Sequence, residues 1–408
     1  MTAAVSDMPG TGAREYSRYR FVIAVLILWA HISIGLNFFA VTPLLPLTID
    51  DYDITRASAS LLVALPTLVK ACIGLPGSLI INRFGLNRVF TVSWFMLGIL
   101  ALSPWIEGFY LMLLLRLLYG IGTGLMMTAT ASLIMQWFRP NEVPIINTLL
   151  LIVISLGIAI SIPLAAPLAK QTSWEGVLGI FGGIGLCGAL AWKLCGRTQS
   201  THIQEASSIF TLRELWQVFR DRTIFLLVVG DALVFVNYAA VTSWLPTFLH
   251  EFRGMDLDQA GYVTGLLPAV GIFAVLLGGF LSLRVQDRRR LFLAPGVLVA
   301  FGGFGAFLLR DPLAINLAIL ALGFGTWVYQ PALLTLPMQL PWMTPRKITV
   351  VWGASLTIAG FGMFISPVVV GASRDLFGTF VPGFSIWAVF GCALIFTGLF
   401  LPKQKRNH

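Results

Sequence analysis

The chain alternates between long apolar stretches and short polar segments. A helix needs roughly 20 apolar residues to cross a bilayer, and twelve stretches of about that length follow one another along the sequence. They cover residues 20–47, 58–82, 89–106, 108–136, 143–169, 174–195, 222–249, 259–283, 291–309, 312–340, 348–372 and 380–401. The polar residues before the first stretch carry no signal-peptide pattern, so we expect that stretch to be the first membrane span. The predicted fold class is an all-α integral membrane protein with twelve transmembrane helices.

A polar interruption near the middle divides these spans into two groups of six. Residues 196–221 are the longest segment without an apolar run, and they include Glu205, Arg213 and Asp221. Boundaries between folding units fall in such exposed polar linkers. We therefore expect a cytoplasmic N-terminal tail at 1–19, an N-terminal six-helix bundle at 20–195, a cytoplasmic linker at 196–221, a C-terminal six-helix bundle at 222–401 and a cytoplasmic tail at 402–408.

The second group of spans repeats the first. The segment NFFAVTPLLP at residues 37–46 matches NYAAVTSWLP at residues 237–246, with six of the ten positions identical. Leu-Pro at 65–66 recurs at 267–268 with a similar offset. An even number of spans in each half gives both halves the same orientation, so the repeat is parallel and the bundles are pseudo-symmetric. This architecture is typical of transporters, whose substrate site lies near the membrane midplane between the repeats.

Composition and charge agree with a membrane protein and exclude a soluble one. Hydrophobic residues make up 57% of the chain and charged residues only 11%, against about 25% charged in soluble domains. The net charge of +9 could indicate a nucleic-acid partner. Most of the 27 Lys and Arg residues, however, fall on the side of the membrane that holds the termini. This sorting is the positive-inside pattern. We therefore expect both termini to be cytoplasmic, in a prokaryotic inner or plasma membrane, and no nucleic-acid partner.

The sequence contains no pattern for a metal, a cofactor or a catalytic centre. The four cysteines lie in or at the ends of spans without the spacing of a metal site or a disulfide framework. A membrane enzyme would need a polar catalytic cluster near an interface, and His202 and His250 have no such set around them. A sensor would add a sizeable soluble domain, which the central loop is too short to form. We expect a protein that is not an enzyme, works as a monomer and meets the lipid bilayer and a small-molecule substrate.

One loop resembles a signature of the major facilitator superfamily, and the resemblance covers essentially the whole chain. The loop after the second span keeps Gly77, Arg83, Gly85 and Arg88, but Asn82 stands where the family has an aspartate. In that family this loop holds the two halves in the outward-open state through charge pairs. The resemblance implies a conformational latch at these five residues, which Asn82 would weaken because it supplies no carboxylate. A degenerate copy with Gly279, Arg284, Arg288 and Arg289 follows the eighth span.

A second resemblance lies in the fourth span, where Arg116 is followed by Gly120, Gly122 and Gly124. In the family this arginine is associated with proton coupling or with substrate charge. The glycine pairs typical of exporters are missing from the fifth span, which disfavours drug export. The Thr-Pro-Leu-Leu-Pro segment of the first span is similar to the cyanate and nitroimidazole transporter branch.

Four ionisable residues interrupt the apolar spans: His31, Lys70, Arg116 and Asp231. Such residues are costly in a membrane and are functional by default. Two cations in one half and a carboxylate in the other suggest an anionic substrate attracted by Lys70 and Arg116. Asp231 and His31 would then carry proton coupling. Other interpretations stay open: Arg116 and Asp231 form a permanent pair, Lys70 extends to the interface, or His31 is a packing residue.

The resemblance implies that spans 1, 4, 7 and 10 line the substrate cavity. Hydrogen-bonding and aromatic residues on these spans are the further substrate-binding candidates: Asn37, Tyr119, Asn237, Tyr238, Trp327 and Gln330. The asparagine pair could equally bond neighbouring helices. We expect a secondary active transporter that works by alternating access and takes up a small anionic solute with protons. The alternative is a proton-antiport exporter of drugs or weakly acidic toxic compounds.

Overall fold

The computed structural model describes residues 17–139, 141–199, 216, 219–285, 287–340 and 342–402. The first half contains α1 (Arg20–Phe38), η1 (Thr42–Leu44), α2 (Leu45–Tyr52), α3 (Arg56–Ala59), α4 (Leu61–Phe84), α5 (Leu86–Leu97), η2 (Gly98–Trp105), α6 (Phe109–Trp137), α7 (Val143–Gln171) and α8 (Trp174–Cys195). The second half contains α10 (Arg222–Arg253), α11 (Leu257–Arg284), α12 (Arg290–Leu308), α13 (Pro312–Val328), α14 (Gln330–Thr335), η3 (Pro337–Gln339), α15 (Pro345–Phe377), α16 (Val381–Gly391) and α17 (Ala393–Phe400).

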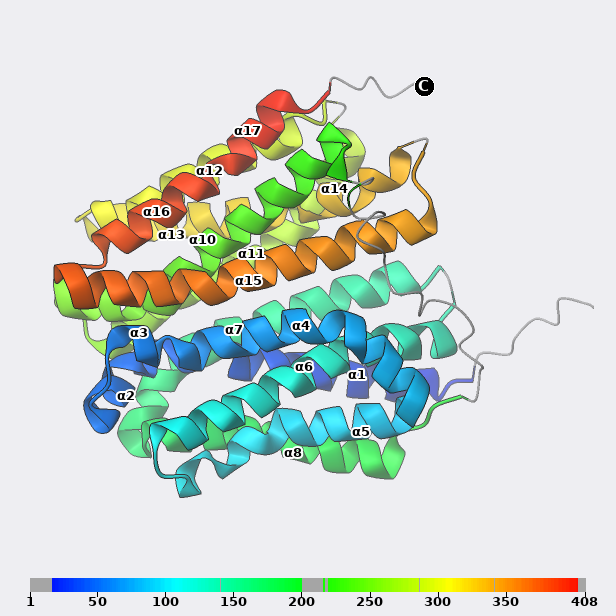
Figure 1. Ribbon diagram of the computed structural model, residues 1–408, viewed down its shortest axis with the longest axis horizontal. Helices are drawn as coiled ribbons and strands as arrows, with labels where there is room; N and C mark the ends of the chain where they lie inside the picture. Colours follow the sequence, from blue (N-terminus) through cyan, green and yellow to red (C-terminus); the bar gives the residue numbers. More distant parts are fainter. Residues whose placement is uncertain are drawn as a thin grey trace, which may run out of the picture.

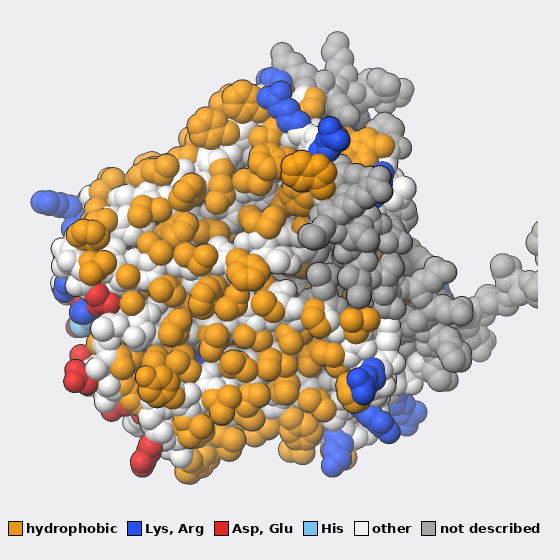
Figure 2. Space-filling model, in the orientation of Figure 1, with side chains coloured by type: hydrophobic (Ala, Val, Ile, Leu, Met, Phe, Trp, Pro, Cys, Tyr) orange, Lys and Arg blue, Asp and Glu red, His pale blue; other side chains and the backbone are white. Residues whose placement is uncertain are grey.

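The helices have the length and apolar character of membrane spans. Among the described residues, 11 helical runs are long and apolar enough to cross a membrane, or 12 when the bent α4 is included. Several runs join two labelled elements, as in α5 with η2 and α16 with α17. The exposed side chains on the face in view are mostly apolar, while acidic side chains gather at its left end (Figure 2). The predicted all-α membrane fold is confirmed.

The two halves form two layers that meet along a seam. In Figure 1, α1 to α8 lie below, and α10 to α17 lie above. Two helix pairs make the seam, α7 against α11 and α4 against α15. The two pairs are equivalent under the internal repeat, since α7 corresponds to α15 and α4 to α11. Glycines allow close approach here: a Cβ atom on Gly360 would lie 2.4 Å from the Cβ of Ala71.

A proline makes the first spans of the two halves different although their sequences repeat. In the first half α1 ends at Phe38, and the chain continues through the 3-10 segment η1. In the second half α10 runs unbroken through the matching segment. Pro43 stands where the second half has Ser243. Proline removes a backbone donor and clashes with the carbonyl one turn earlier, whereas the Ser243 hydroxyl donates to the Ala239 carbonyl within the helix.

The opposite difference occurs in the fourth spans. In the first half α6 is continuous, but its counterpart breaks between α13 and α14 at Tyr329. Pro331 follows this break and takes the place of Thr128 in the repeat. Each half therefore has one continuous helix and one broken helix in this pair of spans.

Ion pairs join the halves at the end of the molecule that holds α3, on the left in Figure 1. The Glu251 carboxylate lies 2.9 Å from the Arg56 guanidinium and 3.0 Å from that of Arg374. A separate pair, Lys170 with Asp258 at 2.5 Å, links α7 to α11. Among the described ion pairs, all those that connect the two halves lie at this end.

Glu251→Gln is expected to loosen this end, because it leaves Arg56 and Arg374 without their shared carboxylate. Thr242 is buried on α10, the helix that carries Glu251 near its C-terminal end. A cysteine at Thr242, in a chain without its four native cysteines, should react about fivefold faster with a maleimide when Glu251→Gln is added, as expected for the loss of ~1 kcal/mol. The control is Glu107→Gln, an exposed side chain in the loop before α6. Equal rates for the two variants would contradict a closing role for these ion pairs.

Candidate functional site

Arg116 is fully buried on α6, and all its described hydrogen bonds go to backbone carbonyls. Its Nη1 and Nη2 donate to the carbonyls of Asn37 and Phe38 at 2.8 and 3.1 Å, and its Nε donates to Leu62 at 2.5 Å. The first two carbonyls belong to the last turn of α1, where a helix leaves acceptors without helical partners. Arg116 therefore closes the end of the broken first span, rather than presenting its charge to an open site.

Tyr119 supports the same helix one turn further along α6. Its hydroxyl donates to the Ile34 carbonyl at 2.8 Å, and its ring lies 5.4 Å from the Arg116 guanidinium carbon. Both side chains are fully buried. The two residues predicted to bind substrate from the fourth span are thus both bonded to the backbone of α1.

Asp231 makes the corresponding contacts in the second half. Its carboxylate accepts hydrogen bonds from the Tyr329 hydroxyl at 2.9 Å and the Gln330 amide at 2.7 Å, which are the two residues at the break between α13 and α14. The Ser355 hydroxyl on α15 donates to the other carboxylate oxygen at 3.3 Å. The permanent pair of Arg116 with Asp231 considered from the sequence is not formed. Each residue instead contacts the broken helix of its own half.

Lys70 is the remaining charged residue predicted from the spans, and its surroundings differ. It is half-buried on α4, and its ammonium group lies 4.9 Å from the centre of the Phe38 ring. No described hydrogen bond or ion pair involves its Nζ atom. An ammonium group removed from water without a counter-charge costs several kcal/mol. Within the described structure, Lys70 is thus an in-span cation with no described hydrogen bond or ion pair.

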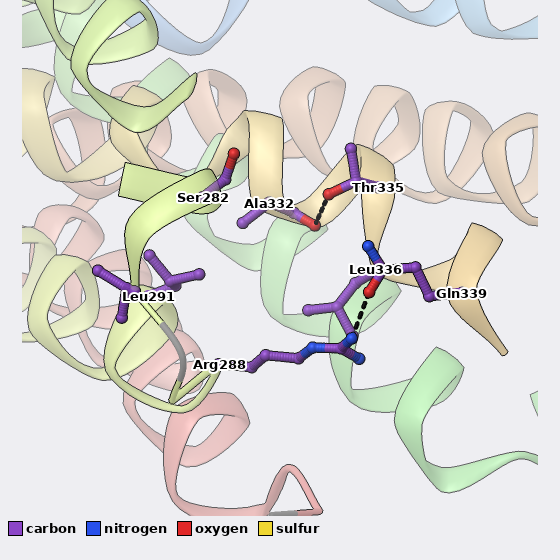
Figure 3. Close-up of a pocket in the computed structure, with 8 residues that line it drawn as sticks. Ser282, Arg288, Leu291, Ala332, Thr335, Leu336 and Gln339 are labelled. Carbon is purple, nitrogen blue, oxygen red and sulfur yellow. Dashed lines mark hydrogen bonds between the residues drawn. The ribbon is translucent and has the colours of Figure 1, made fainter. Parts of the chain in front are cut away.

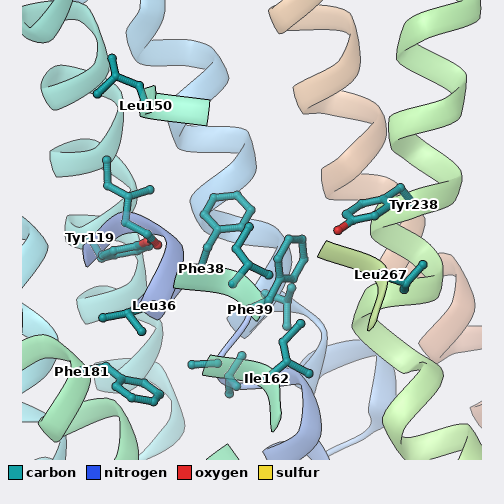
Figure 4. Packing of buried hydrophobic residues seen from close by; sticks show 14 of the residues in the cluster. Leu36, Phe38, Phe39, Tyr119, Leu150, Ile162, Phe181, Tyr238 and Leu267 are labelled. Carbon is teal, nitrogen blue, oxygen red and sulfur yellow. The ribbon is translucent and has the colours of Figure 1, made fainter. Parts of the chain in front are cut away.

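Aromatic side chains from both halves meet at the seam beside this lysine. Figure 4 shows Phe38 and Phe39 facing Tyr238, whose hydroxyl points toward them. Behind Tyr238, the rings of Phe235 and Trp327 stand edge to face at 5.4 Å. The Tyr238 hydroxyl and the Trp327 indole nitrogen are both buried, and they lie near enough to interact with each other. The structure therefore brings Tyr238 and Trp327, two of the predicted substrate-binding residues, together.

The asparagines of the repeat do not reach this seam. The Asn37 amide donates to the Phe181 carbonyl of α8 at 3.1 Å. The Asn237 side chain packs against Gly303 and Gly391, where an added Cβ would lie within 2.9 Å of its nitrogen. Both asparagines thus face peripheral helices of their own bundles, which fits the interhelical alternative. His31 is buried, and its Nδ1 lies 2.8 Å from the Ile27 carbonyl of its own helix.

The predicted latch loop is exposed at the end opposite the ion pairs. Asn82, Arg83 and Arg88 are exposed, and no described hydrogen bond or ion pair links them to the other half. Gly85 has a φ of +84°, which glycine adopts readily, and it ends α4 and begins α5. Gly77 packs against Thr128 of α6, where an added Cβ would lie 3.0 Å from the hydroxyl oxygen.

The degenerate copy of this loop lies beside a small crevice in the second half. Figure 3 shows Arg288 directed toward Gln339, with Ala332 and Thr335 of α14 drawn further up in the view. The Arg288 guanidinium donates to the Gln339 side chain, and the Arg289 guanidinium donates to the Leu401 carbonyl at 2.7 Å. The crevice is lined by residues of the second half and lies away from the seam aromatics.

Several residues of the site were missed by the sequence analysis. Phe38, Phe39 and Phe235 resemble any other aromatic residue in an apolar span, so no local pattern singles them out. Ser355 lies on a different span from Asp231 and becomes its partner only through packing. Tyr329 had a usable signal, because it precedes Gln330-Pro331 in the middle of a span.

Comparison with known proteins places the chain among membrane transporters. The sequence model of the Major Facilitator Superfamily matches residues 27–367. A probable nitrate transporter of Staphylococcus carnosus is 21% identical over 90% of this chain and 92% of its own length. A probable sulfoacetate transporter of Cupriavidus necator is 24% identical over 82% of this chain and 83% of its own length.

Solved structures share the fold. A bacterial homologue of the human lysosomal transporter Spinster, in an inward-facing and occupied conformation, superposes with a TM-score of 0.71 at 18% identity, covering 94% of this chain and 95% of the other. A D-xylose–proton symporter superposes with a TM-score of 0.70 at 17% identity, covering 94% and 97%. The narrower resemblance to the cyanate and nitroimidazole branch stays a prediction. The chain belongs to the Major Facilitator Superfamily and is a multi-pass membrane transporter, not an enzyme.

Proposed function

We propose that this transporter takes up a small anion together with protons, and that Lys70 is the cation that binds the anion. The observation that carries the proposal is the contrast among the in-span charges. Arg116 and Asp231 form hydrogen bonds with protein groups, whereas no described hydrogen bond or ion pair involves the Lys70 ammonium, which lies over the Phe38 ring. Relatives named for nitrate and sulfoacetate, both anions, support this assignment.

Arg116 acts in this proposal as a positioning residue. By holding the last carbonyls of α1, it fixes Phe38, and the Phe38 ring in turn contacts Lys70. The anion attraction expected of both Arg116 and Lys70 is thus assigned to Lys70, because backbone carbonyls hold the Arg116 guanidinium through three of its five N–H donors.

Asp231 carries the proton in this proposal. Its carboxylate is buried and bonded to both residues at the break between α13 and α14 and to Ser355 on the seam helix α15. Protonation turns a carboxylate from an acceptor into a donor as well, so it alters contacts with two elements that pack at or near the seam. We assign coupling to Asp231 rather than His31, since the His31 ring is bonded within α1.

The moving units are the bundles 20–195 and 222–401, connected by the linker 196–221, and both termini are cytoplasmic. The seam pairs α4–α15 and α7–α11 would then rock against one another as the protein alternates between its two states. The ion pairs of Glu251 and Lys170 would close the outer side in the conformation described.

Lys70→Gln is expected to abolish anion uptake, because it removes the unpaired charge while adding no bulk. Lys70→Arg should retain part of the uptake. The measurement is uptake of radiolabelled anion into proteoliposomes, with the amount of folded protein checked by size exclusion. Lys193→Gln, at an exposed lysine near the end of α8, is the control. Full uptake by Lys70→Gln would refute the assignment.

Arg116→Lys is expected to lower stability even though the charge is kept, since an ammonium group cannot reproduce three divergent guanidinium hydrogen bonds. Buried carbonyls left without donors should cost about 2 kcal/mol or more. Thermal unfolding in detergent measures the loss. Arg83→Lys, at an exposed arginine that contacts a phenylalanine ring, serves as the comparison and should leave the midpoint unchanged. A stable Arg116→Lys protein would mean that Arg116 does not hold the helix end.

Asp231→Asn is expected to separate transport from proton coupling, because an amide keeps the shape of the side chain but takes up no proton. Accumulation driven by a pH gradient should fall to the background level, whereas exchange of labelled for unlabelled anion should persist. Asp53→Asn is the control, as Asp53 is exposed in a left-handed turn that asparagine tolerates. Loss of exchange together with accumulation would show that Asp231 is needed for binding or folding and not for coupling.

A further inference from the structure

We infer that the transported anion is monovalent and has a flat apolar body, as an aromatic monocarboxylate does. This inference rests on the proposed function, because it describes what lies around Lys70. It depends on two features of the seam. One is the number of in-span cations without a described hydrogen bond or ion pair, and the other is the kind of side chain around them.

The charge count comes from the three in-span charges. Each of the three guanidinium nitrogens of Arg116 donates a hydrogen bond to a backbone carbonyl. The Asp231 carboxylate accepts three hydrogen bonds from side chains of its own half. Lys70 is the in-span cation that remains in the described structure. A single ammonium can neutralise one negative charge. A second charge on the substrate would enter the seam unpaired, at a cost of several kcal/mol.

The apolar body follows from the rings beside Lys70. Phe38 already lies against the Lys70 ammonium, so a carboxylate bound there would come next to that ring. Phe38 and Phe39 come from the first half, and Tyr238 faces them from the second half (Figure 4). Phe235 and Trp327 are half-buried and extend the aromatic surface. Aromatic rings prefer edge-to-face or offset packing with another ring.

The polar groups at the seam favour an acceptor-rich head and few other polar atoms. The Trp327 Nε1 can only donate, and the Tyr238 hydroxyl can also donate. Leu267, which Figure 4 places near Tyr238, offers no hydrogen-bonding side chain. Each hydroxyl of a sugar acid left without a partner there would cost about 1–3 kcal/mol. Sugar acids should therefore be poor substrates.

The test measures binding of four anions to the purified full-length protein by competition with radiolabelled benzoate and by thermal shift. Benzoate has one negative charge and an aromatic ring, and phthalate adds a second carboxylate. Galacturonate has a hydroxylated sugar ring in place of the aromatic ring, and nitrate has no apolar group. We expect benzoate to bind at least about tenfold more tightly than the other three, since lost apolar or unpaired polar contacts each cost tenfold or more. Lys70→Gln should abolish binding of benzoate.

Two ring deletions test the aromatic surface independently. Trp327→Ala and Phe235→Ala should each weaken benzoate binding about tenfold. Phe235→Ala, which removes no hydrogen-bond donor, should weaken nitrate binding less than it weakens benzoate binding. The matched control is Trp105→Ala, because Trp105 is 77% exposed at the end of η2. Having two deletions keeps the test valid when one variant fails to fold.

The outcomes separate the inference from the proposed function. Tighter binding of nitrate, galacturonate or phthalate than of benzoate, lost in Lys70→Gln, would overturn the inference and leave the proposed function standing. Anion binding that survives Lys70→Gln, or no binding of any of the four anions, would contradict both. Benzoate preference that depends on Lys70 and on both rings supports both.

Discussion

The structure depends on how freed backbone groups are satisfied inside a membrane. A helix broken at a proline leaves carbonyls without partners, and the bilayer core offers no water to replace them. Arg116 supplies two donors at the break in the first span and donates a third hydrogen bond to the Leu62 carbonyl of α4. Pro43 and Arg116 thus act together. Pro43 prevents the helix from continuing, and Arg116 donates hydrogen bonds to the carbonyls at the end of the helix. This also fixes Phe38, whose ring contacts Lys70.

In the second half a residue of the opposite charge contacts a broken span, but it does so through side chains and not through backbone groups. There the tenth span breaks at Tyr329, and Asp231 of the seventh span accepts hydrogen bonds from the residues at the break. The internal repeat therefore survives in the arrangement of the helices but not in their continuity. Each half breaks one span of the central pair and supports that break from the other span, with a cation in the first half and a carboxylate in the second. Arg116 and Asp231 thereby form their hydrogen bonds within their own bundles. Lys70 and the aromatic rings lie at the seam between the bundles.

Much of the fold could be predicted from the sequence, because lipid imposes long apolar helices and the repeat relates the two halves. The charged residues in the spans could also be identified from the sequence, and their roles stay predictions. Their partners could not be predicted. Asn37 and Asn237 lie on spans expected to line a cavity, yet the face of a helix that turns toward a neighbour depends on packing angles that no short pattern encodes. Arg116 satisfies carbonyls set free by Pro43, which lies more than seventy residues away in the sequence.

The central claim is that Lys70 binds the substrate while Arg116 keeps the broken first span in place. A cryo-electron microscopy structure of the protein with benzoate bound tests this most directly. The account predicts density for the carboxylate at the Lys70 ammonium, with the Arg116 guanidinium still bonded to the carbonyls of Asn37, Phe38 and Leu62. Density for the carboxylate on Arg116, with those carbonyls released, would contradict it.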